Sequence, residues 1–127
     1  MQVILVALGG ALGALARWKL GGIVLHHTAN WRFPLGTFVV NVGGCLVAGV
    51  LAGLVIKRDL FSADARLFLF TGLLGGFTTF SAFGVETASL LRRKDYATAL
   101  AYVLLSVLGG VAGVWLAVSA IRGKNST

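Results

Sequence analysis

Residues 71–86 are the most informative part of the chain and read TGLLGGFTTFSAFGVE. The stretch is uncharged until Glu86 and combines an adjacent glycine pair with two threonines and a serine. Glycine destabilises helices, and hydroxyl side chains compete with the helix for backbone hydrogen bonds. The pattern predicts an apolar helix that breaks near its middle, where the freed carbonyls are available to bind ions. A continuous, tightly packed, glycine-rich helix is the alternative.

Four apolar segments account for nearly the whole chain. Hydrophobic residues make up 57% and charged residues 12% of the 127 residues, whereas about a quarter of a soluble domain is charged. About 20 apolar residues suffice to cross the hydrocarbon layer of ~30 Å as a helix. The sequence therefore predicts an all-α membrane protein in which 1–127 form a single transmembrane domain. We expect four transmembrane helices at approximately 3–25, 34–56, 65–92 and 96–121.

The formal net charge of +7 raises the question of a nucleic-acid partner. Nucleic-acid-binding domains gather basic residues on one face, often with aromatic residues between them. In this chain the basic residues stand near the ends of the expected helices instead, which is typical of membrane proteins. We therefore expect the protein to lie in a lipid bilayer and not to bind nucleic acid.

The basic residues are almost evenly divided between the two sides of the membrane. Lys and Arg normally accumulate in cytoplasmic loops. A near-tie is typical of a chain that inserts in both orientations, which permits an antiparallel homodimer, but a single orientation fixed by other features is equally compatible. One side carries Arg17, Lys19, Arg32, Arg92, Arg93 and Lys94, and the other carries Lys57, Arg58, Arg66, Arg122, Lys124 and the N-terminal amine.

Glycine pairs four residues apart recur in the apolar segments. Small residues at this spacing let helix backbones approach closely in lipid. Four short helices seldom enclose a solute pathway alone, so the pairs favour an oligomer, most simply a twofold one. The pairs are Gly9 and Gly13, Gly49 and Gly53, Gly72 and Gly76, and Gly109 and Gly113.

Few polar side chains lie within the segments. Asn41 is the only strongly polar residue of the second segment, and Thr37 lies four positions before it on the same helical face. A carboxamide in hydrocarbon needs partners, and it can donate two hydrogen bonds to an anion or simply join two helices. Tyr102 and Ser106 have the same spacing and form either a hydroxyl track or structural contacts.

Phe77, Phe80 and Phe83 recur every three residues and share a face of the half-helix that carries them. The positive edges of inward-pointing rings can contact a small anion, although core or lipid contact is the alternative.

Arg17 either snorkels to the interface or lines an electropositive vestibule. Glu86 is the sole acid within a span, so we expect either a functional role or an ion pair with a cation such as Arg17.

Signatures of catalysis are missing from the sequence. It contains no set of nucleophile, base and orienting residue, and no phosphate-binding loop. His26 and His27 are adjacent, and no further Cys or His completes a metal site with them. We therefore expect a protein that is not an enzyme.

Two motifs together resemble the Fluc (CrcB) fluoride channel family. They are Gly36-Thr37-Phe38-Val39-Val40-Asn41 and the stretch 71–86, and the similarity runs over essentially the whole chain. The resemblance implies a passive, fluoride-selective channel that lets cytoplasmic fluoride leave the cell and so reduces its toxicity. It also implies a multi-pass protein of the plasma (inner) membrane of a prokaryote. In this family the protein is a dual-topology, antiparallel homodimer with two fluoride pathways and a structural sodium ion at the dimer interface.

The resemblance also implies roles for individual residues. Gly75 and Thr78 match the positions whose backbone carbonyls hold the sodium ion, Arg17 matches the vestibule arginine, and Glu86 matches an acid near the pathway. The chain departs from the family pattern at Gly110 and Ala82, where some members carry hydroxyl residues. The residues that match the fluoride pore are Asn41, Phe80, Phe83, Thr37, Ser81, Tyr102 and Ser106.

Two other functions compete with this interpretation. A small dual-topology, proton-coupled multidrug exporter also has four helices, but its membrane-embedded acid is expected in the first helix, which here contains none. A non-catalytic subunit of a larger membrane complex would use Asn41 and the phenylalanines for packing alone.

Overall fold

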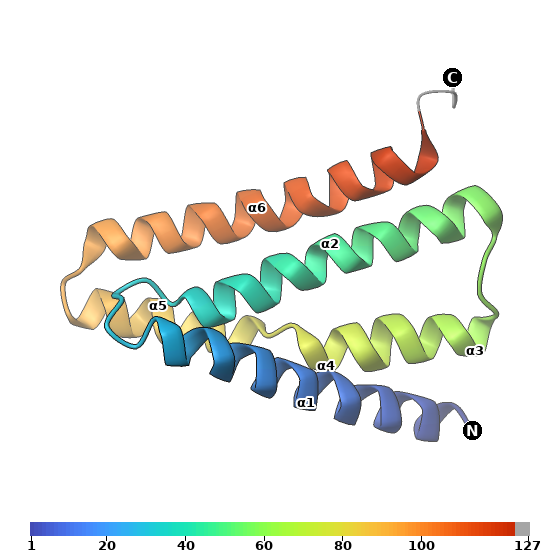
Figure 1. The fold of residues 1–127 in the computed structure, drawn as a ribbon, viewed down its shortest axis with the longest axis horizontal. Coiled ribbons are helices and arrows are strands. Elements are labelled where there is room, and N and C mark those ends of the chain that lie inside the picture. Colours follow the sequence, from blue (N-terminus) through green and yellow to red (C-terminus); the bar gives the residue numbers. More distant parts are fainter. Residues whose placement is uncertain (124–127) are drawn as a thin grey trace.

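Four long helical segments run antiparallel to their neighbours in the computed structural model, which describes residues 1–123 (Figure 1). Lys124, counted above among the basic residues, lies outside the described part. The elements are α1 (Gln2–His27), α2 (Leu35–Arg58), α3 (Ala63–Arg66), η1 (Leu67–Leu74), α4 (Gly75–Phe77), α5 (Phe80–Arg92) and α6 (Tyr96–Arg122).

Each of the four segments is long and apolar enough to cross a bilayer. They contain 26, 24, 30 and 27 residues, the third running from Ala63 to Arg92, and about 20 suffice. The chain is therefore an all-α, multi-pass membrane protein, as its composition predicts. Pro34, expected as the first residue of the second helix, is instead its N-cap.

The backbone of the third segment changes its geometry twice between α3 and α5. The π-helix η1 precedes the short helix α4, and π-helical turns are rare and frequent at functional sites. Thr78 (φ −87°, ψ 155°) and Thr79 (φ −147°, ψ 109°) are extended, so α4 and α5 are separate helices (Figure 1). The Thr79 hydroxyl then caps α5 by accepting the N–H of Ala82 at 3.1 Å.

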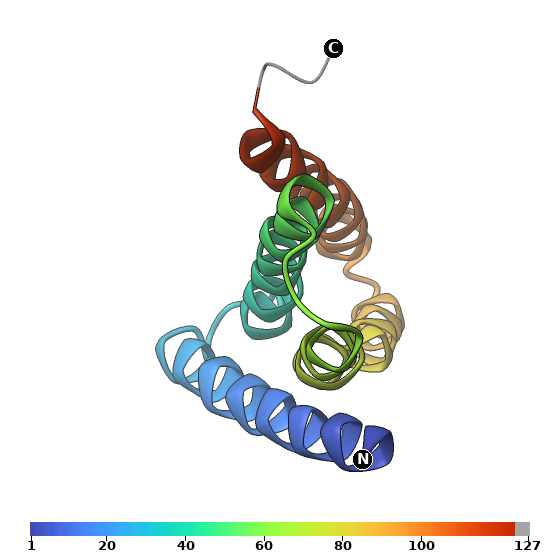
Figure 2. The ribbon, with the colours of Figure 1, turned by 90° about the vertical axis from the view of Figure 1, so that its right-hand side faces the viewer.

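Glycines allow the segments to pack at backbone distance. Helix α1 lies against η1 and α4, while α2 lies against α6 (Figure 2). A Cβ atom at Gly9 would lie 2.9 Å from Gly72 Cα, and one at Gly53 would lie 2.8 Å from Ile121 Cβ. These glycines therefore serve contacts within one chain, because larger side chains would separate the helices.

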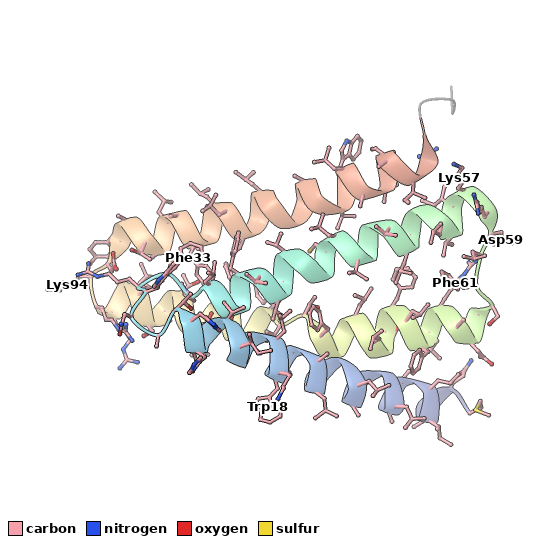
Figure 3. All side chains as sticks on the ribbon, viewed as in Figure 1. Trp18, Phe33, Lys57, Asp59, Phe61 and Lys94 are labelled. Carbon is pink, nitrogen blue, oxygen red and sulfur yellow. The ribbon has the colours of Figure 1, made fainter. Side chains whose placement is uncertain are left out.

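A small buried core lies where α5 turns into α6. Its centre is Leu90, Ala99 and the fully buried Tyr102. Phe33, which lies at this end of the molecule (Figure 3), packs edge-on against Tyr102 with ring centroids 5.3 Å apart. The core thereby fixes the position of the Tyr102 side chain.

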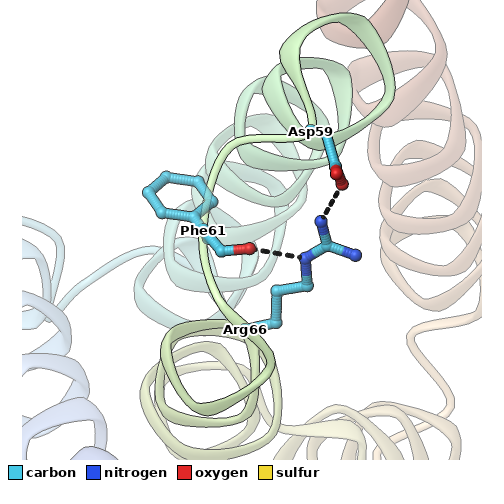
Figure 4. Close-up of polar contacts among 3 residues, drawn as sticks. All are labelled: Asp59, Phe61 and Arg66. Atoms are coloured by element: carbon cyan, nitrogen blue, oxygen red, sulfur yellow. Dashed lines mark hydrogen bonds and ion pairs between the residues drawn. The ribbon is translucent and has the colours of Figure 1, made fainter.

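The loop from α2 to α3 at the opposite end is held by Arg66. Its Nη2 donates to Asp59 Oδ1 at 2.6 Å and its Nε donates to the Phe61 carbonyl at 3.1 Å (Figure 4). Both Asp59 (φ 46°) and Phe61 (φ 77°) have left-handed backbone conformations, which are uncommon for residues other than glycine. Arg66 therefore ties together the tight turn that joins the second and third spans.

Candidate functional site

Asn41, on α2, holds the extended backbone at Thr79. Its Nδ2 donates to the Thr79 carbonyl at 3.0 Å, and its Oδ1 accepts the Thr79 N–H at 2.8 Å. Backbone groups freed from a helix within the bilayer have no water to bind, so the protein must supply partners. The second Nδ2 hydrogen makes no hydrogen bond within residues 1–123 and is available to an anion.

Two further contacts satisfy carbonyls within α4 and directly before it. Arg17, on α1, donates its Nε to the Gly76 carbonyl at 3.1 Å. The backbone N–H and the hydroxyl of Thr78 both donate to the Leu74 carbonyl, each at 3.0 Å. Arg17 therefore points to the interior of the bundle and does not snorkel to the interface.

The carbonyls of Gly75 and Thr78 lack such partners. No hydrogen bond reaches either oxygen from the residues of the described range 1–123. An unpaired carbonyl at membrane depth is costly, and unwound backbone carbonyls are the groups with which membrane proteins coordinate Na⁺. The two oxygens therefore fit the sodium ligands that the family resemblance implies.

Glu86 binds two hydroxyl groups. The Thr37 hydroxyl on α2 donates to Oε1 at 2.7 Å, and the Tyr102 hydroxyl on α6 donates to Oε2 at 2.6 Å. Within residues 1–123 the ion pairs are Arg32 with Asp95 and Arg66 with Asp59. The alternative that Glu86 pairs with Arg17 is therefore wrong, because Arg17 is bound to the Gly76 carbonyl.

The phenylalanines separate into two groups at the break. Phe77 lies in α4, whereas Phe80 and Phe83 lie together in α5, with ring centroids 5.7 Å apart. Phe83 also packs against Tyr102 at 5.0 Å. The Phe80 ring is 84% exposed on the surface of the single chain, so it is available to an ion, to lipid or to a second subunit.

The remaining polar residues of the predicted pore lie on α5 and α6. The Ser81 hydroxyl is 3.3 Å from that of Thr79. Ser106 lies one turn after Tyr102 on α6, and its Oγ is buried without a hydrogen-bond partner among residues 1–123. A buried unpartnered hydroxyl is uncommon in folded proteins, and this one retains a free hydrogen-bond donor.

A pocket of about 430 Å³ lies between α1, α2 and α5. It brings Arg17, Thr37 and Glu86 together with Thr79, and the other predicted pore residues lie outside its lining. Thr79 was not among the predicted site residues, although a threonine directly before an apolar helix is a typical N-cap. The pocket places a fixed positive charge beside the hydroxyl and carboxylate groups.

The chain matches known proteins over nearly its full length. Residues 4–118 match the family described as "CrcB-like protein, Camphor Resistance (CrcB)". The fluoride-specific ion channel FluC of Methylobacillus flagellatus is 54% identical over 121 residues, which cover 95% of this chain and 94% of that protein. Proteins of the same name from Hyphomonas neptunium and Paracoccus denitrificans are each 48% identical to this chain. The match to the first covers 90% of this chain and 93% of that protein, and the match to the second covers 93% of this chain and 92% of that protein. The chain therefore belongs to the CrcB family, as the two motifs around Asn41 and Glu86 predict.

Proposed function

We propose that this protein is a passive, fluoride-selective ion channel and not an enzyme. The proposal rests on its membership of the CrcB family, together with 54% identity to a protein named as a fluoride-specific ion channel. The exporter alternative gains no support, because α1 contains no acidic residue and Glu86 lies late in the third span.

In this proposal the chain works as an antiparallel homodimer in the inner membrane of a bacterium. The near-even division of basic residues and the 84% exposed Phe80 support a second copy. The unpartnered carbonyls belong to Gly75, which begins α4, and to Thr78, which follows it, and a sodium ion bound there would link these oxygens between subunits. Arg17 and Asn41 hold the neighbouring backbone groups in place.

The pathway would offer fluoride several weak contacts in place of a tight site. The free Nδ2 hydrogen of Asn41 donates a hydrogen bond, and the edges of Phe80 and Phe83 carry positive partial charge. The unpartnered Ser106 hydroxyl is a further donor. Glu86 accepts the hydrogen bond of the Tyr102 hydroxyl and so competes with fluoride for this donor, which weakens the binding of the anion. Weak sites in series favour passage over capture.

A passive pore is sufficient to remove fluoride from a cell. Hydrogen fluoride crosses membranes as a neutral molecule and dissociates in a less acidic cytosol, where the anion is trapped. An inside-negative potential drives an anion outward with about 2.3 kcal/mol per 100 mV. No coupled energy source is needed.

The proposal can be tested by rescue of a bacterial strain that lacks its own fluoride exporters. We expect the wild-type chain to restore growth at inhibitory fluoride concentrations and Phe80→Ile, at equal abundance in the membrane, to fail. Absence of rescue by wild-type protein that is present and dimeric in the membrane would contradict the proposed function.

A further inference from the structure

A groove on α6, here called the α6 groove, lies away from the pathway. It has a volume of about 520 Å³, within the range of specific small-molecule sites. Its lining residues are spaced three or four apart and therefore share one helical face. They are Val111, Val114, Trp115, Val118, Ser119 and Arg122, followed by Gly123.

Part of this face of α6 is turned away from the rest of the chain. Gly110, Gly113 and Ile121 face α2, where they lie close to Cys45, Leu46 and Gly53 respectively. The groove lies on the flank of α6 beside this contact: Val114 borders α2, since its Cα lies 2.9 Å from a Cβ placed at Gly49, whereas the Trp115 side chain is 72% exposed. The exposed apolar side chains of this face, Val111 and Trp115, are suited to contact with the acyl chains of lipid.

The groove has the length and polarity of one lipid leaflet. Val111 and Arg122 are eleven positions apart, which corresponds to about 16 Å of α-helix. This length is similar to half the thickness of the hydrocarbon layer of ~30 Å. The walls are apolar from Val111 to Val118, whereas Ser119 and Arg122 supply a hydroxyl and a cation at the end of the helix.

A second cation is fixed beside this end of the groove. The Lys57 ammonium donates to the Ile121 carbonyl at 3.0 Å, next to Arg122 in the chain, and Lys57 lies at the end of the molecule where α6 ends (Figure 3). The lining contains no acidic residue, and the nearby Asp59 is bound by Arg66. The polar end of the groove is therefore suited to an anionic group.

We propose that the α6 groove binds an anionic phospholipid. One acyl chain lies along Val111, Val114, Trp115 and Val118, and the phosphate lies between Arg122 and Lys57 with Ser119 as a hydrogen-bond donor. The charge of the two cations selects an anionic headgroup over a zwitterionic one, because each cation near a membrane surface favours an anionic lipid about fivefold.

Trp115 serves as an internal reporter for the test. In a Trp18→Phe, Trp31→Phe background, Trp115 is the single tryptophan. One set of vesicles contains brominated phosphatidylglycerol diluted in unlabelled phosphatidylcholine. The other set contains brominated phosphatidylcholine diluted in unlabelled phosphatidylglycerol. We expect brominated phosphatidylglycerol to quench Trp115 at a mole fraction roughly 25-fold lower than brominated phosphatidylcholine, because each of the two cations contributes about fivefold. Arg122→Gln and Lys57→Gln each lower this preference about fivefold, and Arg122→Lys retains it.

The matched control removes two charges at the other end of the molecule. Arg92→Gln with Arg93→Gln has the same loss of charge and leaves the preference unchanged. Circular dichroism establishes that each variant is folded. Equal quenching by the two lipids in the wild type, or a preference that survives Lys57→Gln with Arg122→Gln, would overturn the proposal. Quenching by neither lipid would also overturn it, since a second protein chain then covers the groove.

Discussion

The side-chain amide of Asn41 makes a reciprocal pair of hydrogen bonds with the backbone of Thr79, at 3.0 and 2.8 Å. The two residues are 38 positions apart and lie on different spans. A single side chain thus compensates both backbone groups of an extended residue within the membrane. The same amide retains a free hydrogen for an anion, so the structure of the break and the proposed chemistry of the pore depend on one residue.

Asn41→Asp should therefore impair both flux and stability. The carboxylate can still accept the Thr79 N–H, but it cannot donate to the Thr79 carbonyl, and its charge repels an anion. An unsatisfied buried group costs about 1–3 kcal/mol. We expect a lower thermal unfolding temperature and almost no fluoride flux. Cys45→Ala, one turn further along α2, is the control, and wild-type flux in Asn41→Asp would remove Asn41 from the pathway.

Phe80→Ile should separate function from folding of the chain. The ring is 84% exposed in the single chain, so its loss removes little packing within the subunit. Isoleucine has no aromatic edge for fluoride. We expect dimers with near-normal stability and fluoride flux reduced at least tenfold, measured in liposomes against Val85→Ile as the control on the same helix. Undiminished flux would show that the ring contributes only packing.

Thr37 and Tyr102 should act on stability through Glu86. Each hydroxyl donates to one carboxylate oxygen, at 2.7 and 2.6 Å, and a hydrogen bond to a charged group contributes about 1.5–3 kcal/mol. We expect Thr37→Val and Tyr102→Phe each to lower the free energy of unfolding by about this amount. In double-mutant cycles with Glu86→Gln the effects should be strongly non-additive. Additive effects would mean that these hydrogen bonds do not stabilise the chain.

Gly9→Ala should disturb the docking of α1 against η1. The new Cβ would lie 2.9 Å from Gly72 Cα, and neither backbone can yield easily. Overpacking of this kind costs about 1–3 kcal/mol. Gly22→Ala, on the same helix, is the matched control because nothing lies within 4 Å of its Cβ. Equal unfolding temperatures for the two variants would show that α1 is not packed at backbone distance.

Sodium should act as a structural ion and not as a transported one. The carbonyls of Gly75 and Thr78 belong to the backbone at the break and have no other partner among residues 1–123. We expect fluoride flux to be independent of the direction of a sodium gradient, whereas replacement of sodium by a large organic cation lowers the stability of the dimer. Flux that follows the sodium gradient would contradict this role.

The spans could be predicted from the sequence because apolar length alone determines them. The Gly75-Gly76 pair and the adjacent threonines identified the region of irregular backbone, but nothing in the pattern predicts the π-helix before it. This π-helix packs against α1 from another part of the chain, where Gly9 and Gly72 meet. Local propensity does not contain that information.

The candidate site shows the same division between local and long-range information. Asn41 stood out as a polar residue in an apolar helix, yet its partner Thr79 lies on another span and could not be identified from spacing. The suggested ion pair between Arg17 and Glu86 was wrong because both groups found closer partners, the Gly76 carbonyl and two hydroxyls. Charge complementarity alone does not determine which side chains meet.

The most direct test of the central claim is fluoride efflux from liposomes that contain the purified protein. A potassium ionophore releases the charge imbalance, a fluoride electrode follows the anion, and chloride is measured in parallel. We expect rapid release of fluoride while chloride is retained. No release from a folded, dimeric preparation, or equal release of both anions, would contradict the assignment of this protein as a fluoride-selective channel.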